Sequence, residues 1–337
     1  MPSALLTILI AATLLPTQTS DGVPVLDAQR RSAAGPTIPS EATINLHAGY
    51  ASALRVSDAS TGTQETEQPE AEGTPSTFDT PRELLAALAE QDVKTATLRG
   101  GVRYTIIHAL ENDMQVRYGQ LAIRNADNED AALSRKYAVR FNLLEIDDRQ
   151  DVIEEHFIFD GRWFVERYPE EKQFTKRELV PEGKQLDPME LMRDAPFWVS
   201  LGRDQDRLLA SYDATILPTA DGLTDNRDFP ELASLANQPH VANTTQLMLV
   251  PKDDSGFEDD WEFVRIWINT DTLLPALYIK QDWTGDLQIV ELFEPQRDAE
   301  IPAAIFDTTT PDARSGWRIQ ISHWRGDADA SETSPNP

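Results

Sequence analysis

The stretch EEHFIFDGRWFVERYPEEKQFTKREL, residues 154–179, decides the fold of this chain. Aromatic and β-branched residues lie on both sides of Asp160-Gly161 and favour two strands. Glycine accepts a positive φ angle, so this dipeptide suits the tight turn between them. Tyr168-Pro169 marks a second reversal before residues 173–179. The stretch therefore predicts two consecutive hairpins of an antiparallel sheet.

A helix is predicted well before these hairpins, at the start of the folded part of the chain. Thr80 can cap the helix, Pro81 suits its first turn, and Glu83 completes a capping box. Leucines at helical spacing follow, namely Leu84, Leu85 and Leu88. The pattern predicts a helix over residues 81–91.

Most of the remaining sequence alternates between apolar and polar residues, which is typical of strands in an antiparallel sheet with one wetted face. Helical spacing appears over residues 187–212, and a polar insertion occupies residues 218–242. The predicted strands cover residues 96–110, 114–125, 137–146, 152–179, 245–252, 261–269, 275–282, 286–294 and 317–321, with a short turn at 302–306.

The predicted architecture is mainly β (α+β), with roughly ten to twelve strands and two or three short helices. A twisted sheet of this width is more stable when it curls, because free edges are a liability. We expect an incomplete antiparallel β-barrel, a strongly curved sheet whose apolar concave face is covered by short helices as a lid. The patterning leaves two alternatives open, a hollow that holds a ligand or a fully packed core.

Large apolar side chains alternate along the predicted strands and helices, and they are the candidate ligand-binding residues. If the curved sheet encloses a hollow, these side chains would line it. They are Val102, Tyr104, Ile106, Tyr118, Val139, Phe141, Phe157, Phe159, Trp198, Leu201, Leu247, Leu249, Val264, Ile266 and Ile268.

The composition excludes several classes of partner. Acidic residues outnumber basic ones 57 to 30, which gives a formal net charge of −27. Such an excess disfavours nucleic acids and anionic membrane surfaces and favours a basic acceptor or donor protein. The absence of cysteine excludes disulfides, thiolate catalysis and lipid attachment at an N-terminal cysteine.

The N-terminal region differs from the rest in composition. Residues 5–15 form a short apolar run without charge, so we expect residues 1–20 to be a signal peptide and the exported protein to be soluble, without stable membrane insertion. Residues 21–78 are rich in Ser, Thr, Pro and Glu and are predicted to be a disordered linker. The folded domain is expected over residues 79–325, with a disordered tail at 326–337.

No catalytic constellation is evident in the sequence. The five histidines are scattered and lack metal-ligand spacing, and there is no phosphate-binding glycine loop or nucleophile elbow. Glu154-Glu155-His156 does not form an acid–base pair on a strand, because adjacent residues point to opposite faces. The acidic residues 253–260 lack the spacing of a calcium loop. We therefore predict no catalytic residue, no metal site and no cofactor.

The order of these elements resembles that of the LolA-like superfamily of periplasmic lipoprotein carriers and outer-membrane lipoprotein-sorting proteins. The matching pieces are ELLAALAEQ, FIFDGRWFVERYPEEKQFTK, PFWVSLGRDQDRLL, LMLVPKD and the closing run from LPALYIKQDW, within residues 81–321. The resemblance implies a half-barrel with a helical lid, a hydrophobic cavity for acyl chains and a periplasmic location. It also implies that Arg124 latches the lid, although Ile123-Arg124-Asn125 replaces the family's usual Lys-Arg-Pro.

Two functional hypotheses follow from this resemblance. The first is a non-enzymatic periplasmic carrier that binds lipoprotein acyl chains or another lipid and passes them to an acceptor. Its lid would be formed by residues 81–91 and 197–209, with Trp198 and Leu201 facing the cavity. The second is a lipid-responsive sensor, a regulatory module of the cell envelope that binds a partner protein.

Overall fold

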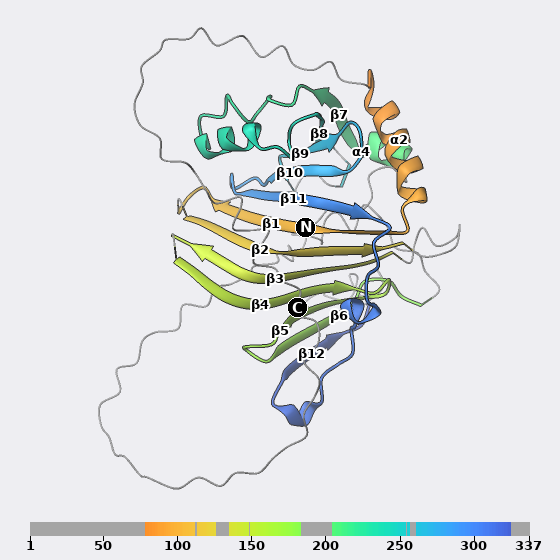
Figure 1. Cartoon of the computed structure of the whole chain (residues 1–337), viewed down its shortest axis with the longest axis vertical. Coiled ribbons are helices and arrows are strands. Elements are labelled where there is room, and N and C mark those ends of the chain that lie inside the picture. The colour runs from red at the N-terminus through yellow and green to blue at the C-terminus, as the bar shows by residue number, and fades with distance from the viewer. Residues whose placement is uncertain are drawn as a thin grey trace, which may run out of the picture. The chain divides into compact units, whose positions relative to one another are not determined.

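The computed structural model describes residues 78–111, 113–125, 135–147, 149–182, 204–253, 255–256 and 261–324. Their strands join in one sheet, shown in Figure 1. The strands are β1 (Thr97–His108), β2 (Asp113–Arg124), β3 (Lys136–Ile146), β4 (Arg149–Phe159), β5 (Trp163–Tyr168), β6 (Gln173–Glu178), β7 (Tyr212–Leu217), β8 (Thr244–Pro251), β9 (Phe263–Asn269), β10 (Pro275–Gln281), β11 (Leu287–Arg297) and β12 (Arg318–Ser322).

The sheet has twelve strands in the order β12-β6-β5-β4-β3-β2-β1-β11-β10-β9-β8-β7. Because β7 and β12 do not pair with each other, the sheet stays open, which confirms the predicted incomplete antiparallel barrel apart from one strand pair. One pairing differs from the prediction: β12 runs parallel to β6, with Ile319 opposite Phe174. A long connection returns the chain from β11 to the far edge, so it can approach β6 in either direction.

The described residues contain two α-helices, α2 (Pro81–Lys94) and α4 (Gln205–Ser211), and the 3-10 helices η2 (Pro230–Asn237), η3 (Ala303–Phe306) and η4 (Ala313–Ser315). The predicted capping box is present in α2. The Thr80 hydroxyl accepts from the Glu83 amide at 3.2 Å, and the Glu83 carboxylate accepts from the Thr80 amide at 3.2 Å. The helix predicted over residues 81–91 is confirmed and extends to Lys94.

We call the side of the sheet that α2 packs against the inner face. Its apolar residues form two buried clusters. The first lies mainly on β1–β5, with one residue on β11, and contains Leu98, Val102, Tyr104, Leu121, Ile123, Tyr137, Val139, Phe141, Phe157, Phe159, Phe164, Val180, Leu274 and Leu292. The second joins β7–β10 to the helices and contains Leu84, Leu85, Leu88, Leu208, Tyr212, Leu247, Leu249, Trp261, Val264, Ile266, Ile268 and Tyr278.

The opposite side, the outer face, is covered in part by the 218–242 insertion. Trp267 donates its indole N–H to the carbonyl of Thr219 at 2.7 Å, and Arg265 pairs with Asp221 at 2.8 Å. Apolar residues of the insertion pack on β1 and β9–β11, in a cluster of Ile107, Leu223, Phe229, Leu232, Leu235, Val241, Trp267, Leu277, Ile279, Leu287 and Ile289. The sequence predicted a wetted face here, and the finding corrects it.

The segment between β11 and β12 covers another part of the outer face. Ile301 and Phe306 pack against Ala122, Ala138, Ile158, Val165 and Phe174. Side chains of the sheet bind main-chain carbonyls of this segment; Lys176, for example, donates to Thr308 at 3.0 Å. Both faces of the sheet are therefore buried over much of their area.

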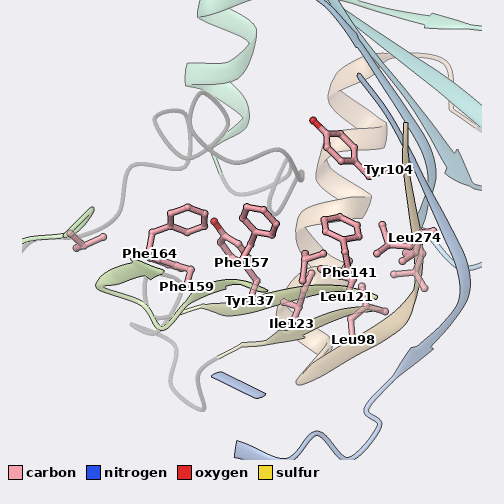
Figure 2. Close-up of a cluster of buried hydrophobic side chains, with 14 residues drawn as sticks. Leu98, Tyr104, Leu121, Ile123, Tyr137, Phe141, Phe157, Phe159, Phe164 and Leu274 are labelled. Atoms are coloured by element: carbon pink, nitrogen blue, oxygen red, sulfur yellow. The ribbon is translucent and has the colours of Figure 1, made fainter. Parts of the chain in front are cut away.

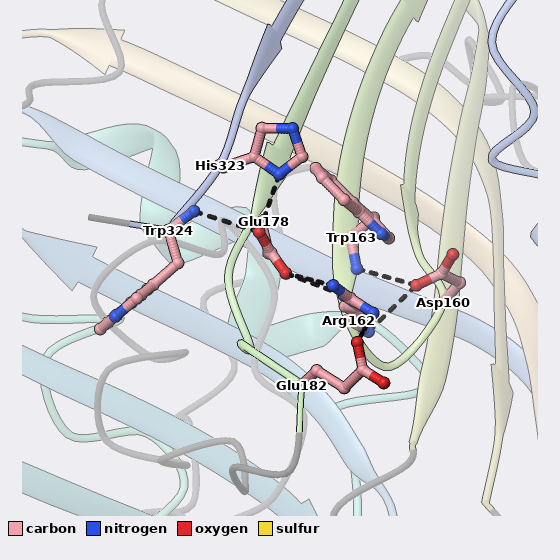
Figure 3. Close-up of polar contacts among 7 residues, drawn as sticks. All are labelled: Asp160, Arg162, Trp163, Glu178, Glu182, His323 and Trp324. Carbon is pink, nitrogen blue, oxygen red and sulfur yellow. Dashed lines mark hydrogen bonds and ion pairs between the residues drawn. The ribbon is translucent and has the colours of Figure 1, made fainter. Parts of the chain in front are cut away.

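A group of polar contacts around Glu178 binds the residues that follow β12, His323 and Trp324 (Figure 3). The Glu178 carboxylate pairs with Arg162 at 2.7 Å, lies 3.1 Å from Nδ1 of His323 and accepts from the main-chain amide of Trp324 at 3.3 Å. At the neighbouring turn, Asp160 accepts from the amide of Trp163 at 2.8 Å, and Gly161 has a φ of 102°. The predicted Asp-Gly turn of the first hairpin is thus confirmed.

Several sequence predictions lie outside the described residues. These are the signal peptide, almost all of the linker, the C-terminal tail and the helical pattern before residue 204. No helix in the described part of the chain is long and apolar enough to cross a membrane.

Candidate ligand-binding face of the sheet

A row of aromatic rings crosses the inner face from β1 to β5, and Figure 2 shows its members Tyr104, Tyr137, Phe141, Phe157 and Phe159. The ring centroids of Tyr104 and Phe141 are 6.1 Å apart, those of Phe141 and Phe157 are 5.9 Å apart, and those of Phe157 and Tyr168 are 6.2 Å apart. Tyr137 contacts Phe159 beside this row, at 5.4 Å. Contacts at these distances are the favourable geometry for aromatic pairs. We call these six residues the aromatic row.

Strand register explains why the row is continuous. Val139 lies opposite Phe157 and Tyr137 opposite Phe159, and directly opposed residues of antiparallel strands share a face. Gly119 lies opposite Phe141, at a register shift between β2 and β3. The missing side chain at Gly119 lets the backbone of β3 approach closely at this point.

The second half of the inner face carries the helices. Leu84 and Leu85 of α2 are completely buried against β7–β10, together with Leu208 of α4. Arg82 of α2 pairs with Asp206 of α4 at 2.7 Å on the exposed surface. The helices therefore cover the inner face over β7–β10, as the lid prediction requires.

The structure brings most of the predicted ligand-binding residues together. The first inner-face cluster takes up Val102, Tyr104, Val139, Phe141, Phe157 and Phe159, with Ile106 packed against it. The second takes up Leu247, Leu249, Val264, Ile266 and Ile268. Trp198 and Leu201 lie outside the described residues.

Tyr118 and Arg124 lie on the outer face instead. Tyr118 is opposite Arg103, whose side chain pairs with Glu291, so the placement of Tyr118 among the inner residues is corrected. Arg124 donates to the carbonyl of Ile301, and its guanidinium lies 5.3 Å from the ring centroid of Phe306. Its described contacts are thus with the segment after β11, and its role as a lid latch stays a prediction.

Sequence reasoning missed an ion pair in the middle of the inner face. Arg117 lies opposite Tyr104, and Glu155 lies opposite Phe141. Nε of Arg117 donates to Glu155 at 3.1 Å, and the two side chains are 4% and 15% exposed. Burial raises the pKa of Glu155, against the opposing effect of Arg117. The sequence does contain a sign of this pair, because residues an even number of positions apart on a strand share a face. Arg117 is four residues before Leu121, and Glu155 is two residues before Phe157, so both belong to the inner face.

His156 points away from Glu155, to the outer face, as strand alternation predicts. It lies opposite both Arg140 and Arg167. Burial, and then the positive charges of Arg140 and Arg167, lower the pKa of His156 to about 4. A neutral imidazole is therefore favoured in the folded state.

This pKa makes stability depend on pH. Between the unfolded value of 6.5 and the folded value of about 4, the unfolded chain binds more protons at His156. The contribution is fully present above pH ~6.5 and is lost as the pH falls through this window. The unfolding free energy of the unaltered chain should fall between pH 7 and pH 4. In His156→Gln we expect this fall to be smaller by about 2 kcal/mol, a value that allows for partial solvent contact of the imidazole.

Urea unfolding of both proteins at several pH values measures this difference. Parallel stability curves for the unaltered chain and His156→Gln would refute the assignment.

Within the described ranges, His, Asp and Glu side chains form no group of three or more that could hold a metal ion.

No protein-family model matches the chain. No curated protein matches its sequence either.

Several solved structures are similar to this chain, at low sequence identity and low TM-scores. A putative outer membrane lipoprotein-sorting protein domain from Vibrio parahaemolyticus is 9% identical, with 67% of this chain and 95% of that chain covered and a TM-score of 0.31. A LolA superfamily protein from Nitrosomonas europaea is 10% identical, with 66% and 96% covered and a TM-score of 0.28. MucB in the MucA/MucB complex of Pseudomonas aeruginosa is 16% identical, with 67% and 60% covered and a TM-score of 0.32.

The described strands themselves define the fold as an open, mainly antiparallel sheet with short helices on its inner face. A LolA superfamily protein is among the solved structures to which this chain is similar. At these identities and TM-scores the comparison assigns this chain no family, no ligand and no residue role.

Proposed function

We propose that this chain is a non-enzymatic carrier that binds the acyl chains of a lipoprotein, or of another lipid, on the inner face of its sheet. The observation that supports this proposal most is the aromatic row within the buried apolar cluster of β1–β5. Transfer of an acyl chain from water to such a face gains about 0.8 kcal/mol per methylene. The chain would then pass its cargo to an acceptor.

Helix α2 is suited to act as the lid of this carrier. Its C-terminal end is anchored, because Asn125 donates to the carbonyl of Asp92 at 3.1 Å and Arg135 pairs with the Asp92 carboxylate. Its N-terminal end is joined to α4 by the Arg82–Asp206 pair, and exposed pairs of this kind contribute little. Rotation about the anchored end would uncover Leu84, Leu85 and the apolar face of β7–β10, which adjoins the face that carries the aromatic row.

The proposed location is the periplasm, and the proposed acceptor or donor is a basic protein. The net charge of −27 supports a basic partner, since opposite charges accelerate encounter. A regulatory module that binds its partner stably is the alternative. A stable complex with one protein, without transfer of lipid, would favour that alternative.

Two adjacent residues of β4 provide the test of the carrier. Ile153 is half-buried against the aromatic row, whereas Val152 points to the other side and is 78% exposed. We expect Ile153→Lys to weaken binding of a fluorescent acyl probe about tenfold or more, because a charge on the inner face must lose water when the chain binds. Val152→Lys adds the same charge and should leave the affinity unchanged.

Circular dichroism and thermal unfolding of both variants show whether the fold is kept. The proposal fails if the unaltered protein does not bind the probe saturably. It also fails if the two lysine variants bind the probe equally well.

A further inference from the structure

The Arg117–Glu155 pair is an unusual component of an apolar face. The two residues come from β2 and β4, and register places them opposite Tyr104 and Phe141. Both belong to the side of the sheet that carries the aromatic row. A guanidinium and a carboxylate are thus held among aromatic rings at 3.1 Å from each other.

A buried ion pair of this kind contributes little net free energy to folding. Removal of two charges from water costs several kcal/mol per ion, and apolar residues of the same volume often serve as well or better. The pair therefore adds little to the fold that leucine and methionine could not supply. Its value lies in the charge that it keeps on the inner face.

The surroundings show which of the two charges is available to a ligand. A guanidinium carries five N–H donors. Glu155 accepts from Nε of Arg117, and Gln115 lies at the limit of hydrogen bonding, 3.5 Å from Nη1. A carboxylate or phosphate binds best through two parallel N–H groups of an arginine, which a single contact to Nε does not use.

The inner face carries other ionisable groups near the Arg117–Glu155 pair. Tyr104 and Tyr168 lie near the pair, and burial raises the pKa of both hydroxyls, so they stay neutral. Arg177 is paired with Glu166 at 2.9 Å, on the neighbouring strands β6 and β5. Glu171 raises the pKa of Glu155 further, after burial. Arg117 therefore differs from Arg177 in that it lies beside the aromatic row. Its partner, Glu155, is also easier to protonate, because burial raises the pKa of that carboxyl.

We propose that Arg117 binds the oxyanion head group, a carboxylate or a phosphate, of an acyl amphiphile whose chain lies along the aromatic row. Glu155 holds the guanidinium in place until the head group replaces it. This inference rests on the proposed function, because the acyl chain must first bind to the inner face. It adds a selectivity that an apolar face alone does not have.

Displacement of a fluorescent acyl probe from the full chain tests this selectivity. Palmitate, palmitoyl lysophosphatidic acid and methyl palmitate share one acyl chain and differ in the head group. We expect the unaltered protein to bind one or both of the anionic lipids about tenfold more tightly than the methyl ester, the effect of one charge-assisted hydrogen bond. The two anionic lipids distinguish a carboxylate site from a phosphate site.

Two double variants show whether the pair carries the selectivity. In Arg117→Met/Glu155→Leu, the preference should fall to less than twofold. Arg103→Met/Glu291→Leu removes a partly buried pair from the outer face, one strand away, and should keep the tenfold preference.

The outcomes separate this inference from the function on which it rests. If the unaltered protein binds none of the lipids, the carrier proposal fails. If it binds all three equally, or if Arg117→Met/Glu155→Leu keeps the preference, the carrier stands and the role of Arg117 is overturned.

Discussion

Replacement of Gly119 by alanine is expected to destabilise the protein by about 3 kcal/mol or more. A Cβ atom at this position would lie 2.8 Å from the carbonyl carbon of Arg140, closer still to its oxygen, and 2.9 Å from Cα of Phe141. All three are backbone atoms of β3, which cannot rotate away as a side chain can. The sheet would have to separate at the register shift that brings Phe141 into the aromatic row.

Urea unfolding of the purified variant measures this effect. Gln120→Ala, at the next residue of β2, is the control, because Gln120 is exposed and its truncation should change stability by no more than about 0.5 kcal/mol. A Gly119→Ala protein as stable as the unaltered chain would mean that β2 and β3 do not approach as described.

The second large effect is expected for Arg117→Met. This variant leaves the Glu155 carboxylate buried without its cation, which typically costs 3–5 kcal/mol. The double variant Arg117→Met/Glu155→Leu removes both charges and should be close to the unaltered chain in stability, or above it. Unfolding free energies of the two single variants and the double variant form the cycle that isolates the pair.

Two results would contradict this account of the pair. One is a double variant as unstable as Arg117→Met, which would show that the pair itself supports the fold. The other is additive behaviour of the single variants, which would show that Arg117 and Glu155 are not coupled.

Local patterns predicted much of this fold. The capping box placed the start of α2 correctly, because Thr80 and Glu83 act within one helical turn. The alternation of Tyr104, Phe141 and Phe157 placed these rings on one face, because side chains on a strand alternate with a period of two.

The failures share a physical cause, since they depend on partners distant in sequence. Arg117 was overlooked because a charged residue on a strand is normally assigned to water, and only its pairing with Glu155, 38 residues away, places it inside. Tyr118 was assigned by its aromatic character, although Arg103 opposite it fixes it on the outer face. Residues 218–242 and 298–317 pack on the outer face, and their sequence patterns do not predict which part of the sheet they contact.

Photolabelling tests the central claim, that the inner face binds an acyl chain, most directly. A palmitate with a diazirine near the end of its chain is irradiated with the full protein, and the labelled residues are identified by mass spectrometry. Among the described residues, the account predicts labels on the inner face, at Tyr104, Phe157 or Tyr168, and their loss when excess palmitate competes. Labels confined to exposed residues such as Val152 and Trp283, or labelling that palmitate does not reduce, would contradict it.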